Sequence, residues 1–351
     1  MDPSVTSLLP IQCIVPPHML EAIKLRGDAR LKRVAQQMER DCERFRLTRQ
    51  VRVRAEAPEP RAARIKPERE VYDAQHQRRL PGKLARKEGG KRSQDADVNR
   101  AHDGAGATFK LYLQVYGRNS LNDSGMKLVS SVHYARSYNN AFWDGRQMVY
   151  GDGDGILFRS LTRSLTVIGH ELSHGVVKFS GDLVYRDQSG ALNESFADVF
   201  GCLTQQYRKK QMAAEADWLV GDGILGLDVK GVALRSLKAP GTAYDDPVLG
   251  KDPQPFHMDG FVNTSSDKGG VHINSGILNH AFYLLAQTLG GHAWEKAGQI
   301  WYDALLSIGN PHASFSDWAD QTVEMARDRY GAGSSEALHT RRSWKLVGIS
   351  L

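Results

Sequence analysis

The chain has 351 residues, a hydrophobic fraction of 41% and a formal net charge of +6. This length suffices for two domains plus an extension, and the lack of an apolar run of about eighteen residues predicts that no helix spans a membrane. Three unpatterned cysteines exclude a disulfide framework and a cysteine-based zinc site. The first residues lack the basic region and long apolar core of a signal peptide, which predicts a cytoplasmic protein as encoded and leaves export by another route open.

Residues 1–69 are predicted to be a detachable segment. Pro16-Pro17 precedes a stretch whose apolar residues recur at helical spacing, and three later prolines among charges are typical of a linker. This part of the chain is rich in arginine but has no interleaved aromatic residues, so we expect no nucleic-acid partner. The residues concerned are Leu20, Ile23, Leu31, Val34 and Met38 in the helix, and Pro58, Pro60 and Pro67 in the linker.

Residues 70–160 indicate a mixed but strand-rich domain. Phe109–Leu113 and 129–134 alternate partly between apolar and polar residues. Residues 139–143 and 147–150 fit a hairpin with Asp144-Gly145 at its turn. Residues 152–155, Asp-Gly-Asp-Gly, fail the EF-hand template because an isoleucine follows where an oxygen ligand is needed, so we interpret them as a tight turn.

A metal site is predicted by His170 and His174, which are four residues apart and therefore lie on one face of a helix. Two neutral imidazoles so placed can share a zinc ion. Glu171 lies one position along, where it can reach a water on the metal rather than the metal itself. The helix is supported by apolar residues at helical spacing: Leu165, Ile168, Leu172 and Val176.

A zinc ion held by two histidines needs a third protein ligand and one open position. Glu194 follows His174 with nineteen residues between them, which allows a turn and a return helix. Asp198 lies four residues later on the same helical face, where it can accept the distal N–H of a ligand histidine. The apolar residues around Glu194 and Asp198 indicate that this helix is buried, where an unpaired carboxylate would be costly. A paired role for the two carboxylates is therefore favoured over a solvated helix face. The apolar residues are Phe196, Val199 and Phe200.

A third polar stretch covers residues 267–276. Its glycine pair lets the backbone approach a neighbour closely. His272 follows the glycines, and Asp267 nearby indicates an oriented, partly charged imidazole.

In these stretches the chain resembles the thermolysin family of zinc endopeptidases, over about residues 70–351. The family's motifs occur in its order: His-Glu-Leu-Ser-His at 170–174, Asn-Glu-Ser-Phe-Ala-Asp at 193–198 and Gly-Gly-Val-His-Ile-Asn-Ser-Gly at 269–276, with further likeness at 139–155, Tyr185 and Arg235. The short N-terminal segment with Pro16-Pro17 resembles that of the protealysin-like subgroup. The implied fold is an α+β, two-domain zincin, with a strand-rich domain at 70–160, a mainly helical domain at 161–351 and the zinc cleft between them.

The resemblance implies one catalytic zinc ion, held by His170, His174 and Glu194. It implies Glu171 as the base that takes a proton from water. The remaining implied catalytic groups are His272 and Tyr185, which donate toward the developing oxyanion, with Asp267 orienting His272 and Asp198 supporting a ligand histidine. The family's paired-calcium site is doubtful, because Thr166 and Gln205 stand at its acidic positions; other calcium sites are left open.

The resemblance also implies how substrate binds. Asn140 and Ala141 pair with the substrate backbone, and Arg235 binds a substrate carbonyl oxygen. An apolar pocket follows the scissile bond, and it favours cleavage before bulky hydrophobic residues; its lining is Phe158, Leu161, Val167, Leu234 and Val271.

The predicted function is therefore a zinc-dependent neutral endopeptidase made as a zymogen. Its partners would be peptide or protein substrates, with its own propeptide as an inhibitor of high effective concentration. Cys13 is a less favoured candidate to cap the zinc ion in the latent form. Two alternatives are a zinc aminopeptidase of another gluzincin type and, less favoured, a non-catalytic zinc-bearing binding protein.

Overall fold

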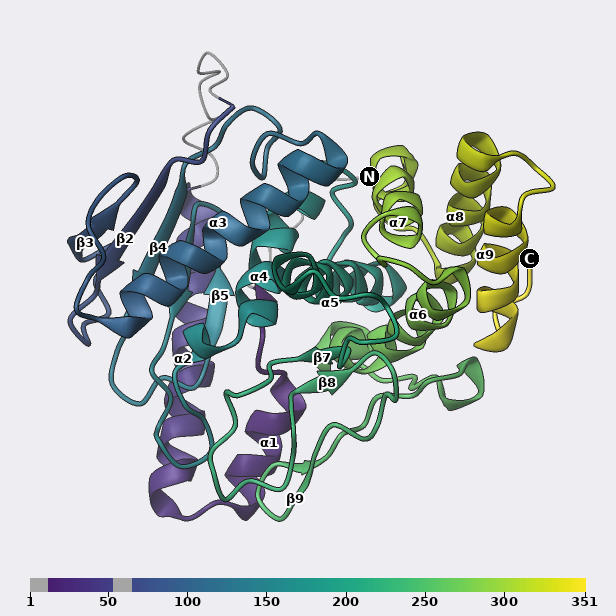
Figure 1. Ribbon diagram of the computed structural model, residues 1–351. Helices are drawn as coiled ribbons and strands as arrows, with labels where there is room; N and C mark the ends of the chain where they lie inside the picture. Colours follow the sequence, from purple (N-terminus) through teal and green to yellow (C-terminus); the bar gives the residue numbers. More distant parts are fainter. Residues whose placement is uncertain (1–11, 53–64) are drawn as a thin grey trace, which may run out of the picture.

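A six-stranded mixed sheet forms the N-terminal half of the molecule in the computed structural model, which describes residues 12–52 and 65–351 (Figure 1). The strand order is β1-β5-β6-β4-β2-β3, in which β4 runs parallel to both β2 and β6, and the other pairs are antiparallel. The strands are β1 Gln12–Cys13, β2 Arg69–Asp73, β3 Lys83–Lys87, β4 Leu128–Val132, β5 Ala141–Trp143 and β6 Gln147–Tyr150.

Helix α3, Ala96–Tyr116, packs against the sheet and contains Phe109–Leu113, for which a strand was predicted. That prediction is wrong, because an alternation of five residues is too short to outweigh a helical pattern sustained over the whole segment. Asp95 caps the helix start and accepts the N–H groups of Asp97 and Val98. Residues 103–108 of α3 are rich in glycine and alanine and allow a close helix contact, since a Cβ on Gly104 would lie 2.5 Å from a methyl of Ile168.

The predicted hairpin is confirmed by β5 and β6, which pair Ala141 with Tyr150 and Trp143 with Met148. Gly145 in its turn has a φ of 100°, which only glycine adopts readily. The tight turn after β6 is organised by Asp154, whose carboxylate accepts three successive backbone N–H groups, those of residues 156–158.

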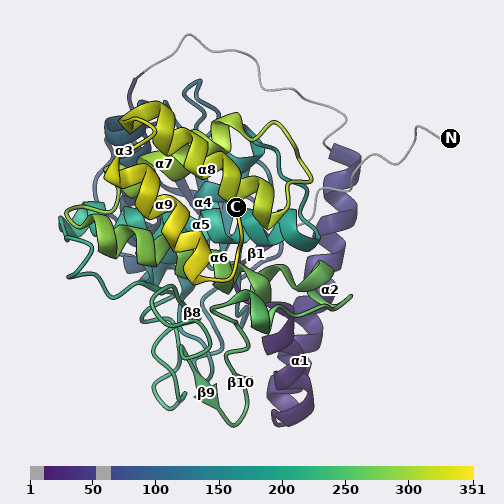
Figure 2. The same cartoon turned by 90° about the vertical axis from the view of Figure 1, so that its right-hand side faces the viewer.

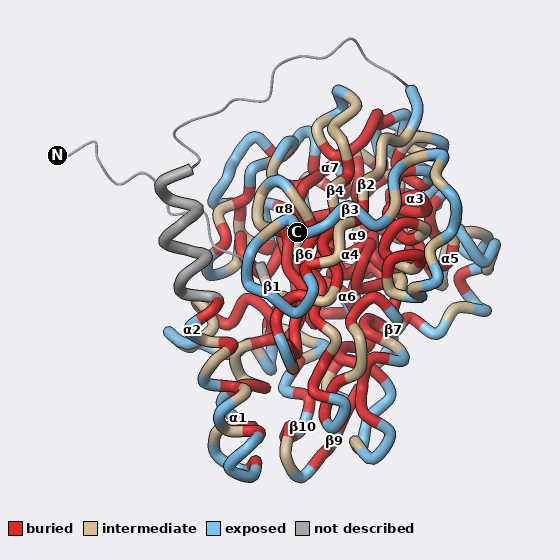
Figure 3. Tube along the Cα trace, turned by 90° about the vertical axis from the view of Figure 1, so that its left-hand side faces the viewer, coloured by how far each residue is buried: buried red, intermediate tan, exposed pale blue. Residues whose placement is uncertain are grey.

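The C-terminal half is mainly helical, so the predicted α+β architecture is confirmed. Helix α5 packs against α4 on one side and α6 on the other. Figure 3 shows buried residues concentrated along α4, α6 and the neighbouring strands, with exposed residues on the outer loops. The helices are α4 Leu165–Lys178, α5 Asp187–Lys209, α6 Asp267–Leu289, α7 Lys296–Ser307, α8 Phe315–Tyr330 and α9 Ser335–Leu346. Shorter elements are η1 Leu161–Arg163, η2 Met258–Gly260, β7 Leu219–Val220, β8 Arg235–Ser236, β9 Asp245–Asp246 and β10 Gly250–Lys251.

The N-terminal segment forms β1 and two helices, α1 Pro17–Arg26 and α2 Ala29–Arg52, which stand at the margin of the molecule (Figure 2). Pro17 occupies the first helical position of α1, where its missing N–H costs nothing. The predicted apolar face is confirmed: Leu20, Ile23, Leu31 and Met38 are buried, and Val34 is half-buried against the same core. The predicted linker prolines Pro58 and Pro60 lie outside the described residues. Among the helices that the structure describes, none has both the length and the apolar character needed to cross a bilayer.

Candidate active site

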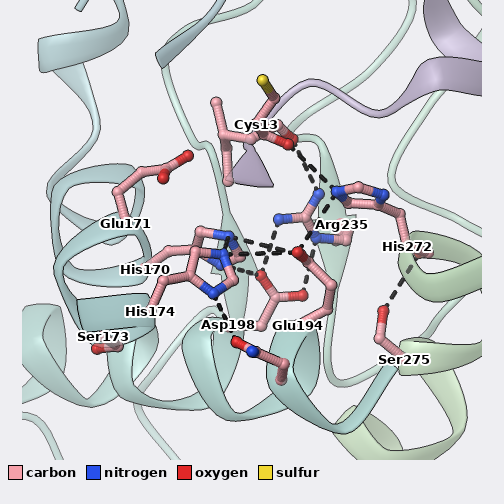
Figure 4. A network of polar contacts seen from close by, with 12 residues as sticks. Cys13, His170, Glu171, Ser173, His174, Glu194, Asp198, Arg235, His272 and Ser275 are labelled. Carbon is pink, nitrogen blue, oxygen red and sulfur yellow. Dashed lines mark hydrogen bonds and ion pairs between the residues drawn. The ribbon is translucent and has the colours of Figure 1, made fainter. Parts of the chain in front are cut away.

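Helix α4 presents His170 and His174 on one face, and Glu194 of α5 lies opposite them (Figure 4). The two Nε2 atoms are 3.0 Å apart. Each lies 3.5 Å from an oxygen of Glu194. All three side chains are buried, and their ligand atoms lie within 4.8 Å of one another.

These three residues fit a zinc ion. Two imidazoles and one carboxylate are a usual ligand set for catalytic zinc, which leaves a position for water. Burial lowers the pKa of His174 to about 3, which keeps the ring in the neutral form that binds metals. The buried Glu194 Oε2 has no hydrogen-bond partner in the described part of the chain, and a cation would satisfy it.

The other nitrogen of each histidine faces an acceptor. His174 Nδ1 is 2.8 Å from Asn193 Oδ1, and His170 Nδ1 is 2.8 Å from Asp198 Oδ1. Acceptors at Nδ1 hold the proton there and leave each Nε2 free to bind metal. The sequence thus predicted the partnership of Asp198 correctly but missed Asn193, although Asn193 directly precedes Glu194.

Asp198 is the centre of a buried polar network. Arg235 donates to both of its oxygens at 2.8 Å, and Asn279 donates at 2.9 Å. Burial acts to raise the pKa of Asp198, but Arg235 and His170 hold that pKa below its usual range. Asn279 carried no signal in the sequence, since it lies on α6, 81 residues away.

Glu171 lies on α4 and is fully buried. Its Oε2 accepts the backbone N–H of Trp143 at 3.0 Å, whereas Oε1 has no partner among the described residues. Burial and the charge of Glu194 raise the pKa of Glu171 well above its usual value. A raised pKa makes this carboxylate a stronger base near neutral pH.

His272 lies near the start of α6, shortly after four successive residues with positive φ, 267–270. Asp267 accepts twice from it, with 2.7 Å to Nδ1 and 2.8 Å to the backbone nitrogen. Burial lowers the pKa of His272, but Asp267 and Glu194 outweigh burial and raise it overall. Its Nε2 lies 3.1 Å from Tyr185 Oη, and Tyr185 also donates to Glu194. The structure thus brings His272, Tyr185 and Asp267 together beside the three ligands.

The N-terminal strand β1 runs through the site beside β5. Ile14 N–H donates to Ala141 O at 3.2 Å, and Val15 N–H donates to Asn140 Oδ1 at 3.0 Å. Arg235 Nη1 donates to Ile14 O at 3.1 Å. These contacts bring Asn140, Ala141 and Arg235 to the backbone of residues 14 and 15.

Cys13 approaches the site through its backbone. Its carbonyl oxygen lies 3.2 Å from His272 Nε2. Figure 4 shows the Cys13 sulfur directed away from His170, His174 and Glu194. This geometry does not fit a thiol cap on a zinc ion.

The side chain of Ile14 is fully buried and belongs to the main apolar core. Four of the predicted pocket residues belong to the same core, and the fifth, Val271, is equally buried. The four are Phe158, Leu161, Val167 and Leu234. At the doubted calcium positions, the Thr166 hydroxyl accepts Gly221 N–H at 2.9 Å, and Gln205 is buried.

Comparison with known protein families identifies the chain. Residues 38–178 match the thermolysin metallopeptidase catalytic domain, and residues 181–349 match the thermolysin metallopeptidase alpha-helical domain. The chain belongs to the thermolysin family of metallopeptidases. It is a zinc-dependent peptide hydrolase, as the resemblance implied.

Individual relatives agree with this family. Protease PrtS of Photorhabdus sp. (strain Az29) is 52% identical over 286 residues, covering 81% of this chain and 76% of that protein. The extracellular metalloprotease of Pectobacterium carotovorum subsp. carotovorum is 43% identical over 97% of both chains. Among solved structures, the precursor of protealysin from Serratia proteamaculans matches with a TM-score of 0.88 and 43% identity, over 97% of this chain and 100% of that chain. This match to a precursor supports the prediction of a zymogen.

The predicted cytoplasmic location is wrong. The Pectobacterium relative, which matches this chain over nearly its whole length, is named an extracellular metalloprotease. The prediction failed because the test for a signal peptide reports on only one route of export.

Proposed function

We propose that this thermolysin-family chain is an endopeptidase whose residues 1–69 hold it latent, and whose catalytic parts are residues 70–160 and 161–351. One observation carries the proposal: residues 12–15 cover the His170, His174 and Glu194 cluster and the adjacent Glu171, with Gln12–Cys13 as strand β1. An enzyme whose own chain fills the substrate cleft is inhibited until that segment leaves, since tethering keeps its local concentration high.

A zinc ion, when bound by these ligands, supplies positive charge that polarises water and the carbonyl to be attacked. Glu171 takes a proton from the attacking water at Oε1 and passes it to the leaving nitrogen. His272 and Tyr185 donate hydrogen bonds to the carbonyl oxygen as it becomes negative. Asp267 holds the His272 ring in place for this role.

Substrate recognition in the proposal combines backbone pairing with one apolar pocket. Asn140, Ala141 and Arg235 hold the substrate backbone as they hold residues 14 and 15 of the precursor. In this proposal the pocket after the scissile bond takes a bulky hydrophobic side chain, and the buried side chain of Ile14 occupies it in the precursor. The substrates are therefore peptides and proteins cut before such residues.

The strand geometry favours an endopeptidase over an aminopeptidase. Backbone contacts lie on both sides of the Cys13–Ile14 bond, and β1 pairs with β5 from Gln12 onward. An aminopeptidase needs a group that binds a free amino terminus at this point, whereas here the chain continues through it.

The test is a blocked, internally quenched peptide with leucine after the bond to be cut. The protein without residues 1–69 should hydrolyse this peptide. The Glu171→Ala variant should have a kcat/KM at least about a thousandfold lower, because the base is lost. Its zinc content should stay at one ion per chain, because all three ligands remain. Zinc is measured by mass spectrometry of the metal in the same samples. Near-normal hydrolysis by Glu171→Ala would disprove the role of this carboxylate.

A further inference from the structure

The Cys13–Ile14 peptide bond lies among the groups that act on a substrate. On its carbonyl side, Cys13 O is 3.2 Å from His272 Nε2, which is itself 3.1 Å from Tyr185 Oη. On its nitrogen side, Ile14 N–H donates to Ala141 O at 3.2 Å, and Ile14 O accepts from Arg235. Both halves of one peptide bond are therefore held.

Glu171 lies close to the nitrogen that would leave. The backbone N–H of Ile14 donates to Ala141 O, and it also favours the charged form of the Glu171 carboxylate, which acts against the rise in pKa that burial causes. Glu171 Oε1 accepts no hydrogen bond in the part of the chain that the structure describes. The base thus has one oxygen available for a proton from water and lies beside the nitrogen that must receive that proton.

We propose that Cys13–Ile14 is a self-cleavage site, cut by the active site of the same molecule. The inference rests on the endopeptidase activity proposed above. Water adds to the Cys13 carbonyl carbon, and the bond from that carbon to the Ile14 nitrogen breaks. Cys13 gains a carboxylate and Ile14 gains an amino terminus; water supplies the oxygen and the protons, so no other reactant is needed.

This cut does not activate the enzyme. The new terminus at Ile14 stays in the cleft, since Ile14 and Val15 are buried and α1 remains attached. Helix α1 is held by the buried Met19 and Ile23, and by His18, whose Nε2 is 3.0 Å from Tyr244 Oη. The first product is therefore a clipped, still latent form.

Activation needs a second cut, in the predicted linker. While residues 13–15 fill the cleft, that cleft is closed to the linker of its own chain. The linker is therefore cut by another enzyme molecule whose cleft is open. The two cuts differ in kinetic order: the first is independent of protein concentration, and the second rises with it.

The experiment follows the zinc-loaded full chain over a hundredfold range of concentration, with intact mass spectrometry and amino-terminal sequencing. Loss of residues 1–13 should proceed with one rate constant at every concentration and should be absent in Glu171→Gln. A matched pair tests the geometry: Ile14→Leu should be clipped within about threefold of the natural rate, whereas Ile14→Asp should be slowed about a hundredfold or more, because a buried unpaired carboxylate is costly. A compact, protease-resistant α1–α2 segment in the Ile14→Asp protein checks that it still folds.

Two results would overturn the self-cleavage: an Ile14 terminus whose rate of appearance rises with protein concentration, or the same terminus in Glu171→Gln. Hydrolysis of the quenched peptide distinguishes a failure of the self-cleavage proposal from a failure of the proposed endopeptidase function. If the processed protein hydrolyses the peptide but no Ile14 terminus forms at any stage, only the self-cleavage proposal is disproved. If the processed protein does not cut the peptide, the proposed endopeptidase function is disproved.

Discussion

Gly201→Ala should weaken zinc binding although residue 201 touches no ligand atom. A Cβ at Gly201 would lie 2.6 Å from Thr166 O, and real Cβ atoms do not come closer than 3.0 Å, so α5 must move by at least 0.4 Å from α4. Glu194 lies seven residues, or two helical turns, before Gly201 on the same face of α5. A metal site tolerates errors of only about 0.2 Å in its ligand distances.

Two effects on stability compete in this variant. Alanine is favoured over glycine in a helix interior by about 1 kcal/mol, whereas overpacking a close contact costs about 1–3 kcal/mol. The obstructing atom is a backbone oxygen, which does not rotate away. The cost of overpacking should therefore exceed the gain in helix propensity by up to about 2 kcal/mol. The expected result is a lower melting temperature together with at least about a tenfold loss of zinc affinity.

The assay uses precursors that also carry Glu171→Ala, which prevents self-digestion, with thermal unfolding and competition for zinc by a chelator. Gly333→Ala is the matched control, since Gly333 lies between α8 and α9 with no heavy atom within 4 Å of an added Cβ; it should change neither quantity. A Gly201→Ala protein that melts higher and binds zinc normally would refute the argument from helix spacing.

Three further predictions concern specificity, latency and pH. Peptides with Leu or Phe after the cut should exceed those with Asp by at least about a hundredfold in kcat/KM, because the pocket residues are apolar; a profile dominated by acidic residues would contradict the pocket. Glu171→Ala alone should stay full length while the natural protein shortens, and a separate 1–60 peptide should inhibit only weakly because tethering is lost; an uncut, fully active natural protein would contradict latency. The hydrogen bond to Asp152, opposed by burial and aided by Asp95, raises the pKa of His133 to about 9, so its stabilisation is full below about pH 6.5 and is lost as pH rises through 9. The difference in unfolding free energy between the natural protein and His133→Asn should therefore shrink over that range, and a constant difference would refute this.

The sequence was sufficient for the groups whose spacing is local. His170, Glu171 and His174 lie within one helical turn, so their relative positions follow from helix geometry alone. Asp198 was predicted as the partner of a ligand histidine because it lies four residues after Glu194. The hairpin from β5 to β6 could also be predicted from the sequence, since its turn residues are adjacent in the chain.

Contacts between distant parts of the chain were beyond such reasoning. The sequence predicted a tethered inhibitory segment but not its register, because the partners of Ile14 and Val15 lie at Asn140, Ala141 and Arg235, more than a hundred residues away. The helix at Phe109–Leu113 was missed for a related reason. Gly104 in the same helix weakens an isolated helix, and it is required there by the approach of Ile168 from α4.

The place of β1 at the end of the sheet order has a consequence for the handling of the protein. Because β5 is next in that order, loss of β1 leaves the N–H and C=O groups of Ala141–Trp143 on an open edge. An open edge strand pairs with any extended chain, including a frayed segment of a second copy. The precursor is therefore the form suited to synthesis and storage at high concentration, and the processed enzyme should be lost to self-association and mutual digestion unless peptide occupies that edge.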